Sequence, residues 1–281
     1  MHRVAVVVPC FNDGDTLPAT LESLRGEEPH ELVVVDDGSD DPATVETLAG
    51  LAAEGVNVVR RDNGGLSAAR TTGVEATTAP LVFPLDADDE VVPGALAALA
   101  DALDATTTAA LAWGDILVWG ELEAKLAVAR SLDPWLLTYL NDVPVASMIR
   151  RSALEAVGGW SMGSGYEDWD LWLALAEHGY TGIHVDRPTL RYRRRTGRML
   201  GDATSQHATL YDKLRRRHAA LFVARGSNRR SSSAPIRTKV AFPLVDRLPL
   251  DPFTRHRLYL FLNRPRQAIA FRRLRRTASS R

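Results

Sequence analysis

Hydrophobic and polar residues alternate in blocks along the first third of the chain. Four short runs of β-branched and other apolar residues, without regular polar alternation, are typical of strands covered on both faces. They lie at residues 3–9, 31–35, 56–59 and 81–83. Between them, apolar residues recur at helical spacing, as at Leu17, Leu21 and Leu24. This order predicts an α/β fold with a Rossmann-like, mostly parallel sheet flanked by helices.

The predicted helices have recognisable ends. Asp15 is the expected N-cap of a helix over residues 16–25. Pro42 stands in the first turn of the next helix, which Gly55 ends.

The second half of the chain has a different pattern. Residues 111–119 alternate between apolar and polar positions, which predicts a half-buried strand. Residues 144–151 predict another strand, and residues 170–178 a helix that Gly179 ends. We therefore expect three parts, at residues 1–110, 111–224 and 225–281.

The composition is that of a globular protein. With 281 residues, 45% hydrophobic and 25% charged, the chain can bury one large core or two small ones. Its one cysteine, Cys10, excludes an internal disulfide and a cysteine-rich zinc site. Neither a signal-like segment nor an apolar run of about 18 residues occurs, so we expect a cytoplasmic protein.

Charge is distributed unevenly. Residues 1–227 carry 20 Lys and Arg against 33 Asp and Glu, whereas residues 228–281 carry 14 against 2. Residues 225–235 are rich in Ser and Arg, which predicts a linker. Residues 252–276 mix apolar residues with clustered arginines, which predicts a basic, partly amphipathic tail. Two interpretations stay open for the tail: binding to an anionic surface at the inner face of the membrane, or docking on the acidic body of the same protein. No nucleic acid is expected, because no base-reading motif accompanies the charge.

Polar clusters follow the predicted strands. Because the carboxyl ends of parallel strands meet at one edge of a sheet, we expect these clusters to line a single rim. The alternative is that they are ordinary polar loops. The clusters are Phe11-Asn12, Asp36-Asp37, residues 63–70 and Asp86-Asp88-Asp89.

The acidic turn at residues 84–90 is the centre of this rim. Asp86, Asp88 and Asp89 repel one another unless a cation or solvent intervenes, and a hard divalent cation suits them. A solvated turn that caps the following helix is the alternative. If a nucleotide binds at this rim, it does so without either of the two glycine-rich phosphate-binding motifs, because neither occurs in the chain. Its pyrophosphate would then be held by a cation together with Arg70.

A second group of candidates lies at the start of a later predicted helix. Tyr166, Glu167, Asp168 and Trp169 stand there, where the helix dipole favours an ionised carboxylate. Such a carboxylate can act as a general base, although the same residues could simply cap the helix.

Five motifs in this order resemble family 2 glycosyltransferases of the GT-A fold. They lie at residues 8–12, 34–39, 63–73, 85–89 and 165–170, and the resemblance extends over residues 3–220. It implies a nucleotide-sugar-binding half at residues 1–110 and an acceptor-binding, catalytic-base half of the same domain at residues 111–224.

The resemblance implies roles on the donor side. Phe11 would line the base pocket, Asp37 would accept a hydrogen bond from the base, and Arg70 would contact the diphosphate. Asp88, with Asp89, would hold the Mn²⁺ or Mg²⁺ that bridges the phosphates of a UDP-, dTDP- or GDP-linked sugar. The implied donor-binding set is Pro9, Phe11, Asn12, Asp37, Gly65, Arg70, Asp86, Ala87 and Asp88.

On the acceptor side, the resemblance implies that Asp168, with Glu167 as the second choice, takes the proton from the acceptor hydroxyl. The reaction would be an inverting transfer to a glycan or lipid-linked saccharide, as in polysaccharide biosynthesis. Aromatic residues would form the acceptor wall: Trp113, Trp160, Tyr166 and Trp169.

One motif departs from the family pattern. Family members often carry a metal-binding histidine near a late strand, whereas Arg195 stands near that position here and His207 is the nearest later histidine. Because guanidinium has no lone pair to donate, either the metal relies on aspartates, phosphates and water, or Arg195 contacts the phosphates directly. Two other functions remain as alternatives: a sugar nucleotidylyltransferase, and a non-catalytic scaffold that docks through its basic tail.

Overall fold

The computed structural model describes residues 2–120, 123–163, 165–194, 206–265 and 267–268. Within these residues a nine-stranded sheet has the order β3-β2-β1-β4-β8-β6-β9-β5, with β7 paired to β6. The strands are β1 (Val4–Cys10), β2 (His30–Asp36), β3 (Asn57–Arg60), β4 (Leu81–Pro84), β5 (Glu90–Val91), β6 (Ala109–Gly120), β7 (Ala124–Leu126), β8 (Met148–Arg150) and β9 (Thr181–Arg194).

Strands β3, β2, β1 and β4 run parallel, as the sequence pattern predicts. β8 is antiparallel to β4 and β6, while β6 and β9 form a long parallel pair. The predicted α/β class with a mostly parallel, Rossmann-like sheet is confirmed, with antiparallel strands in the second half. Cys10 pairs with Asp36, so β1 and β2 end together at one rim.

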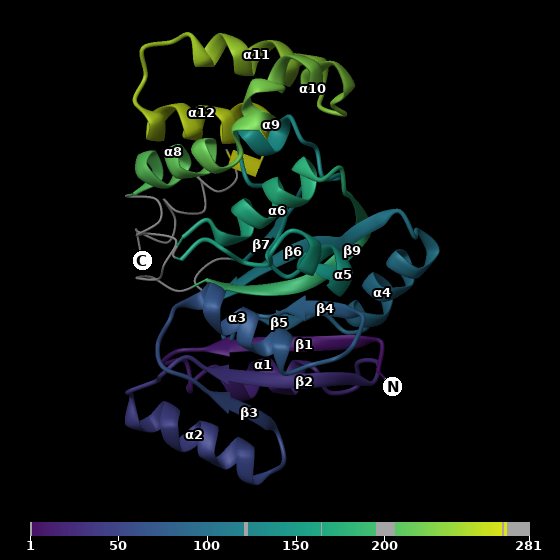
Figure 1. Cartoon of the computed structure of the whole chain (residues 1–281), viewed down its shortest axis with the longest axis vertical. Coiled ribbons are helices and arrows are strands. Elements are labelled where there is room, and N and C mark those ends of the chain that lie inside the picture. Colours follow the sequence, from purple (N-terminus) through teal and green to yellow (C-terminus); the bar gives the residue numbers. More distant parts are fainter. Residues whose placement is uncertain (1, 121–122, 164, 195–205, 266, 269–281) are drawn as a thin grey trace.

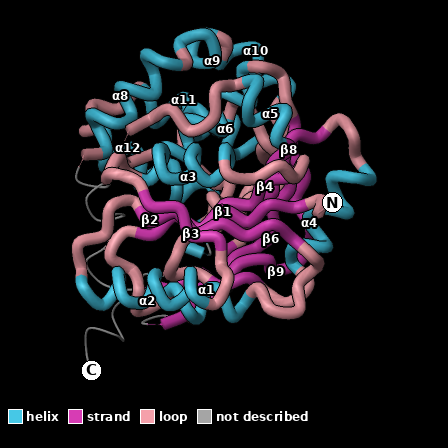
Figure 2. The backbone as a smooth tube through the Cα atoms, turned by 60° about the horizontal axis from the view of Figure 1, so that its bottom comes forward, coloured by secondary structure: helices cyan, strands magenta, loops and turns pink. Residues whose placement is uncertain are grey.

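Helices cover both faces of the sheet, with α3, α5 and α6 on one side and α1 and α2 on the other (Figure 2). The side chains of β1 alternate accordingly: Val6 packs in the core with α1 and α4, and Val7 in the core with α3. The helices are α1 (Leu17–Ser23), α2 (Pro42–Ala53), α3 (Leu66–Glu75), α4 (Ala95–Ala105), α5 (Arg151–Ala156) and α6 (Glu167–Glu177).

Two local predictions are corrected. The N-cap of α1 is Thr16 rather than Asp15. The strand predicted as half-buried, β6, has its first seven residues all buried. Both faces of β6 are covered, since Leu111 belongs to one core and Ala112 to the other.

Residues 207–263 form a layer of helices at one end of the molecule, drawn at the top of Figure 1. Phe242 and Tyr259 pack with Trp135 and Tyr139, which flank the short 3-10 helix η1 (Leu136–Thr138). None of the described helices is long and apolar enough to cross a bilayer. The helices are α8 (His207–Arg217), α9 (Ala219–Val223), α10 (Arg225–Ser231), α11 (Ile236–Asp246) and α12 (Pro252–Asn263).

The linker predicted for residues 225–235 is wrong over most of its length, because Arg225–Ser231 form α10. Arg225 itself lies over the Tyr139 ring and donates to Thr138, so this segment is anchored on η1. In the described part of the basic tail, Tyr259 of α12 is buried in the same core. That part of the tail therefore docks on the body of the protein.

Candidate active site

The loops after β1 and β2 are joined by Asn12. Its side chain accepts hydrogen bonds from the backbone N–H groups of Asp40 and Asp41 and donates to the Asp40 carboxylate. Its φ of 56° is a left-handed conformation that asparagine tolerates better than most residues. Phe11, just before it, is 46% exposed. The predicted convergence of these two loops at one rim is therefore present.

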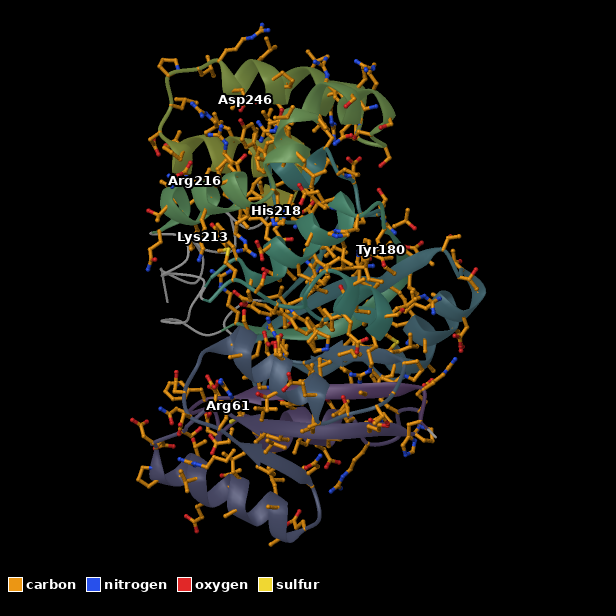
Figure 3. The ribbon with its side chains drawn as sticks, viewed as in Figure 1. Arg61, Tyr180, Lys213, Arg216, His218 and Asp246 are labelled. Carbon is orange, nitrogen blue, oxygen red and sulfur yellow. The ribbon has the colours of Figure 1, made fainter. Side chains whose placement is uncertain are left out.

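Asp37 anchors the neighbouring loop. It is 3% exposed, and its carboxylate accepts the backbone N–H groups of Gly64 at 3.1 Å and Gly65 at 2.7 Å. It also pairs with Arg61, whose position is labelled in Figure 3. Gly65 has a φ of 83°, which glycine adopts without steric cost, and α3 begins after it. Asp37 thus holds the start of α3 against the end of β2, and its contact with a base stays a prediction.

Arg70 connects the two halves of the rim. It lies on α3, is 1% exposed, and pairs with Asp86 at 2.8 Å and with Glu167 at 3.3 Å. Its guanidinium lies 5.7 Å from the ring centroid of Trp160. Burial lowers the pKa of Arg70, but the two carboxylates raise it by more, so the side chain stays charged. One buried cation therefore joins the acidic turn after β4 to the start of α6.

The position of Arg70 depends on how closely α3 approaches β1. A Cβ atom at Gly73, one turn after Arg70, would lie 2.3 Å from Cγ1 of Val7. Ala69, on the same side of the helix, is fully buried. Only a glycine at position 73 lets the helix lie at this depth.

The acidic turn after β4 holds its carboxylates in different settings. Asp86 pairs with Arg70, whereas Asp88 is half-buried and its backbone carbonyl accepts from Nε of Arg193 at 3.2 Å. Asp89 is 1% exposed, and its Oδ1 accepts the backbone N–H of Arg193 at 2.9 Å. Arg193, on β9, thus ties the turn to the second half of the sheet.

A metal ion fits this turn only with help from a substrate. Among the described residues, no group of three or more His, Cys, Asp or Glu side chains could hold a metal. Mg²⁺, however, is commonly bound by one or two carboxylates and completes its shell with phosphates and water. Asp88 and Asp89 are the residues that would hold it. Arg195 lies outside the described residues, so the alternatives raised for it are untested.

The candidate base stands at the start of α6, where Tyr166 is the N-cap. Asp168 accepts a hydrogen bond from the Asn141 amide and one from the backbone N–H of Trp169, both at 2.8 Å. Burial and the adjacent Glu167 raise the pKa of Asp168 to about 6. A carboxylate with this pKa is ionised at neutral pH and can still take up a proton.

The four predicted acceptor residues have different surroundings. Trp113 and Trp169 are 0% and 1% exposed, and their indole N–H groups donate to backbone carbonyls. The acceptor-wall prediction is therefore corrected for these two, because their side chains belong to the core beneath the site. Trp160 is also buried, at 4% exposed, but its ring lies beside the Arg70 guanidinium. Tyr166 is half-buried and stands two residues before Asp168. The acceptor roles of these two stay predictions.

Three side chains that no sequence pattern connects lie at or near the start of α6. Asn141 precedes Asp168 by 27 residues and holds it. His207 shares a 2.9 Å hydrogen bond with the Tyr166 hydroxyl, and the His256 ring lies 4.4 Å from the His207 ring. The sequence pointed to His207 only as a distant substitute for a metal ligand. No spacing rule links these positions, because tertiary packing alone brings them together.

The comparisons with known proteins agree with this geometry. A sequence profile described as "Glycosyl transferase family 2" matches residues 5–158, more than half of the chain. The chain belongs to glycosyl transferase family 2. The predicted family is thereby confirmed, and the predicted enzyme class, a glycosyltransferase, is confirmed at the level of the family.

Relatives in this family align over different lengths. The uncharacterized glycosyltransferase Rv0539 of Mycobacterium tuberculosis is 30% identical over 210 residues, which cover 69% of this chain and 87% of that protein. The succinoglycan biosynthesis protein ExoU of Rhizobium meliloti is 39% identical over 99 residues, or 34% of this chain. That alignment spans only 29% of ExoU, less than a third of its length.

The fold is similar to that of TarS from S. aureus. The crystal structure of TarS 1-349 in complex with UDP-GlcNAc superposes with a TM-score of 0.65 at 14% identity. The match covers 93% of this chain and 82% of that one. At this identity the likeness concerns the fold, and it agrees with the predicted GT-A architecture.

Proposed function

We propose that this family 2 glycosyltransferase moves a sugar from a nucleotide-sugar donor to a hydroxyl group of a glycan or lipid-linked saccharide, with inversion and with assistance from a divalent cation. The observation that carries the proposal is the buried Arg70, which contacts Asp86 on the donor side and Glu167 beside the candidate base. This contact supports a single site shared by residues 1–110 and 111–224.

A nucleotide-sugar donor is supported by the likeness to TarS, which has been solved with UDP-GlcNAc and with UDP. In this chain the base would lie against the exposed ring of Phe11 and within reach of Asp37. UDP, dTDP and GDP all offer a ring N–H to a carboxylate. Arg70 would stabilise the diphosphate as it leaves with its negative charge.

Asp168 would act as the general base. In its ionised form it takes the proton from the acceptor hydroxyl while that oxygen attacks the anomeric carbon. The bond to the diphosphate then breaks on the opposite face, which inverts the configuration. The pKa of Asp168, raised to about 6, suits this exchange near neutral pH. Glu167, paired with Arg70, remains the second choice.

A divalent cation would be held by Asp88 and Asp89. When bound, it supplies positive charge to the leaving diphosphate. Arg193 lies beside both residues through the contacts described above, so its guanidinium adds charge to the same region.

The two alternatives have less support. A sugar nucleotidylyltransferase would need a glycine-rich, basic loop after the first strand, whereas here Asn12 ties that loop to Asp40 and Asp41. A non-catalytic scaffold is less favoured because the chain belongs to a glycosyltransferase family and because Asp168 stands beside the buried Arg70–Glu167 pair. We expect the enzyme to work in the cytoplasm, or at the inner face of the membrane where a lipid-linked acceptor is found.

The test is donor turnover with UDP-, dTDP- and GDP-linked sugars, with and without Mn²⁺. We expect Asp168→Asn to lower kcat by about 100-fold or more while donor binding, followed by thermal shift, persists. Asp88→Ala should weaken metal-dependent donor binding. Asp186→Asn is the matched control, since its side chain is 83% exposed. Unchanged turnover in both Asp168→Asn and Asp88→Ala would refute the assigned roles.

A further inference from the structure

The outward side of α11 carries a row of exposed apolar residues. Ile236, Val240 and Leu244 follow one another at four-residue spacing and are 78%, 48% and 53% exposed. Leu248, just beyond the helix, is 46% exposed. Scattered apolar residues are normal on a protein surface, but a row along one helix face marks an interaction site.

The opposite side of α11 holds the helix in place. Thr238, Phe242 and Val245 are buried there. The Phe242 ring packs on Tyr139 and Tyr259, with ring centroids 5.0 Å and 4.8 Å away. The exposed row therefore points away from a well-packed interface. Figure 1 shows α11 at the end of the molecule opposite α2.

Basic side chains flank this row. Arg237 and Arg247 are exposed, and Lys239 is half-buried. Asp246 is the acidic residue of α11, and its carboxylate is engaged by Tyr259 and Arg225 on the inner side (labelled in Figure 3). The outward face therefore combines apolar contact area with positive charge.

We propose that this α11 face, formed by Ile236, Arg237, Val240, Leu244 and Arg247, docks on a bilayer that contains anionic lipids. A helix lying in the membrane interface buries its apolar row at the acyl boundary and pairs its basic side chains with anionic headgroups. Residues 1–227, with 33 acidic against 20 basic residues, are repelled by the same surface. The charge distribution thus turns the α11 end of the molecule toward the lipid.

This proposal moves the membrane contact from the tail predicted by sequence to a different helix. Tyr259, in the centre of α12, is buried against the body, and the exposed apolar residues of α12, Phe253, Leu260 and Phe261, are only 37–40% exposed. The α11 row, at 48–78%, offers more apolar surface to a bilayer. A second copy of the chain suits the α11 face less well. In a symmetric dimer the same basic residues would face one another and repel. The proposal is independent of the donor and acceptor assignments above.

The first test is co-sedimentation of the full chain with vesicles of phosphatidylcholine alone or mixed with phosphatidylglycerol. We expect binding to the anionic vesicles only. The double variant Val240→Glu/Leu244→Glu should bind the anionic vesicles with an affinity at least about tenfold lower, because it places negative charge in the apolar row. Val45→Glu is the matched control, since Val45 is a 39% exposed apolar residue on α2.

A second measurement reports the docking face directly. The lone cysteine, Cys10, is buried, so a polarity-sensitive fluorophore can be attached to Val240→Cys or, as the control, to Val45→Cys. A blue shift on adding anionic vesicles is expected at position 240 and not at position 45.

Three results would overturn the proposal. Unchanged binding by the double variant would assign the membrane contact to other basic residues, such as those beyond residue 264. Equal binding to neutral vesicles would remove the role of charge. A wild-type dimer that the double variant dissociates would show that a second copy covers the face. Vesicle binding does not require turnover, so loss of the proposed enzymatic activity would leave this test intact.

Discussion

At the residue scale, Asp168 lies between groups with opposing effects on its proton affinity. Burial and the charge of Glu167 raise its pKa, whereas Arg70, the Trp169 N–H and the Asn141 amide lower it. The balance, about 6, leaves the carboxylate ionised at neutral pH. The proposed chemistry therefore depends on the groups that surround Asp168 as well as on Asp168 itself.

Replacing Asn141 with alanine should raise the pKa of Asp168, because it removes a donor that favours the ionised form. Activity that needs ionised Asp168 increases as pH rises through this pKa. The acid limb of the kcat profile should therefore move to higher pH by about one unit, the value of one charged hydrogen bond. Asn57→Ala, on an exposed position of β3, should leave the profile in place. An Asn141→Ala profile that coincides with wild type would contradict this role.

At the scale of elements, the contact between α3 and β1 decides the depth at which Arg70 enters the site. The buried faces of the two elements meet at Val7, Ala69 and Gly73. Because the helix carries Arg70 rigidly, a change in this packing should affect both stability and donor binding.

Gly73→Ala should destabilise the fold by about 1–3 kcal/mol, the usual cost of overpacking a core. Its Cβ would lie 2.3 Å from Val7 Cγ1. Gly50→Ala, inside α2 with nothing within 4 Å of its Cβ, should instead stabilise by about 0.5–1 kcal/mol. Urea unfolding of both variants checks the difference. If the two substitutions changed the free energy of unfolding equally, the close packing of α3 on β1 would not require glycine at position 73.

At the scale of the whole molecule, the C-terminal helices reach the site through a cluster of rings. His256 of α12 lies over His207 of α8, which in turn bonds the Tyr166 hydroxyl at the start of α6. Burial lowers the pKa of both histidines, and that of His256 falls to about 4. The folded C-terminal layer thus favours the neutral rings.

Docking of α12 should therefore weaken in acid. A histidine whose pKa is lower in the folded than in the unfolded state stabilises the fold above its unfolded pKa of about 6.5, and this stability is lost as pH falls toward 4. We expect the free energy of unfolding to drop by about 1–2 kcal/mol between pH 7 and pH 5 through this group. His256→Phe should flatten that dependence, whereas His178→Gln, at an exposed position, should not. Parallel pH curves for wild type and His256→Phe would exclude the linkage.

Local pattern was sufficient for much of the first half of the fold. Continuous apolar runs are a property of neighbouring residues, so β1, β2 and β4 were identified from them, and parallel strands necessarily bring their carboxyl ends to one rim. The meeting of Arg70 with Asp86 follows from that topology. The alternating pattern at β6 predicted a half-buried strand, and this was wrong because small and polar residues in a strand can be covered as completely as large apolar ones.

The sequence by itself determined the order of the elements, the family motifs and the charge difference between body and tail, because each is written in residues close together along the chain. Tertiary structure decided which aromatic side chains are buried in the core and which residues from distant segments contact one another. Trp113 and Trp169 are core residues, and Asn141 reaches Asp168, only because distant segments pack together. The C-terminal helices are the clearest case: only packing against Trp135 and Tyr139 decided that Phe242 of α11 and Tyr259 of α12 are buried and that Ile236, Val240 and Leu244 of α11 face outward.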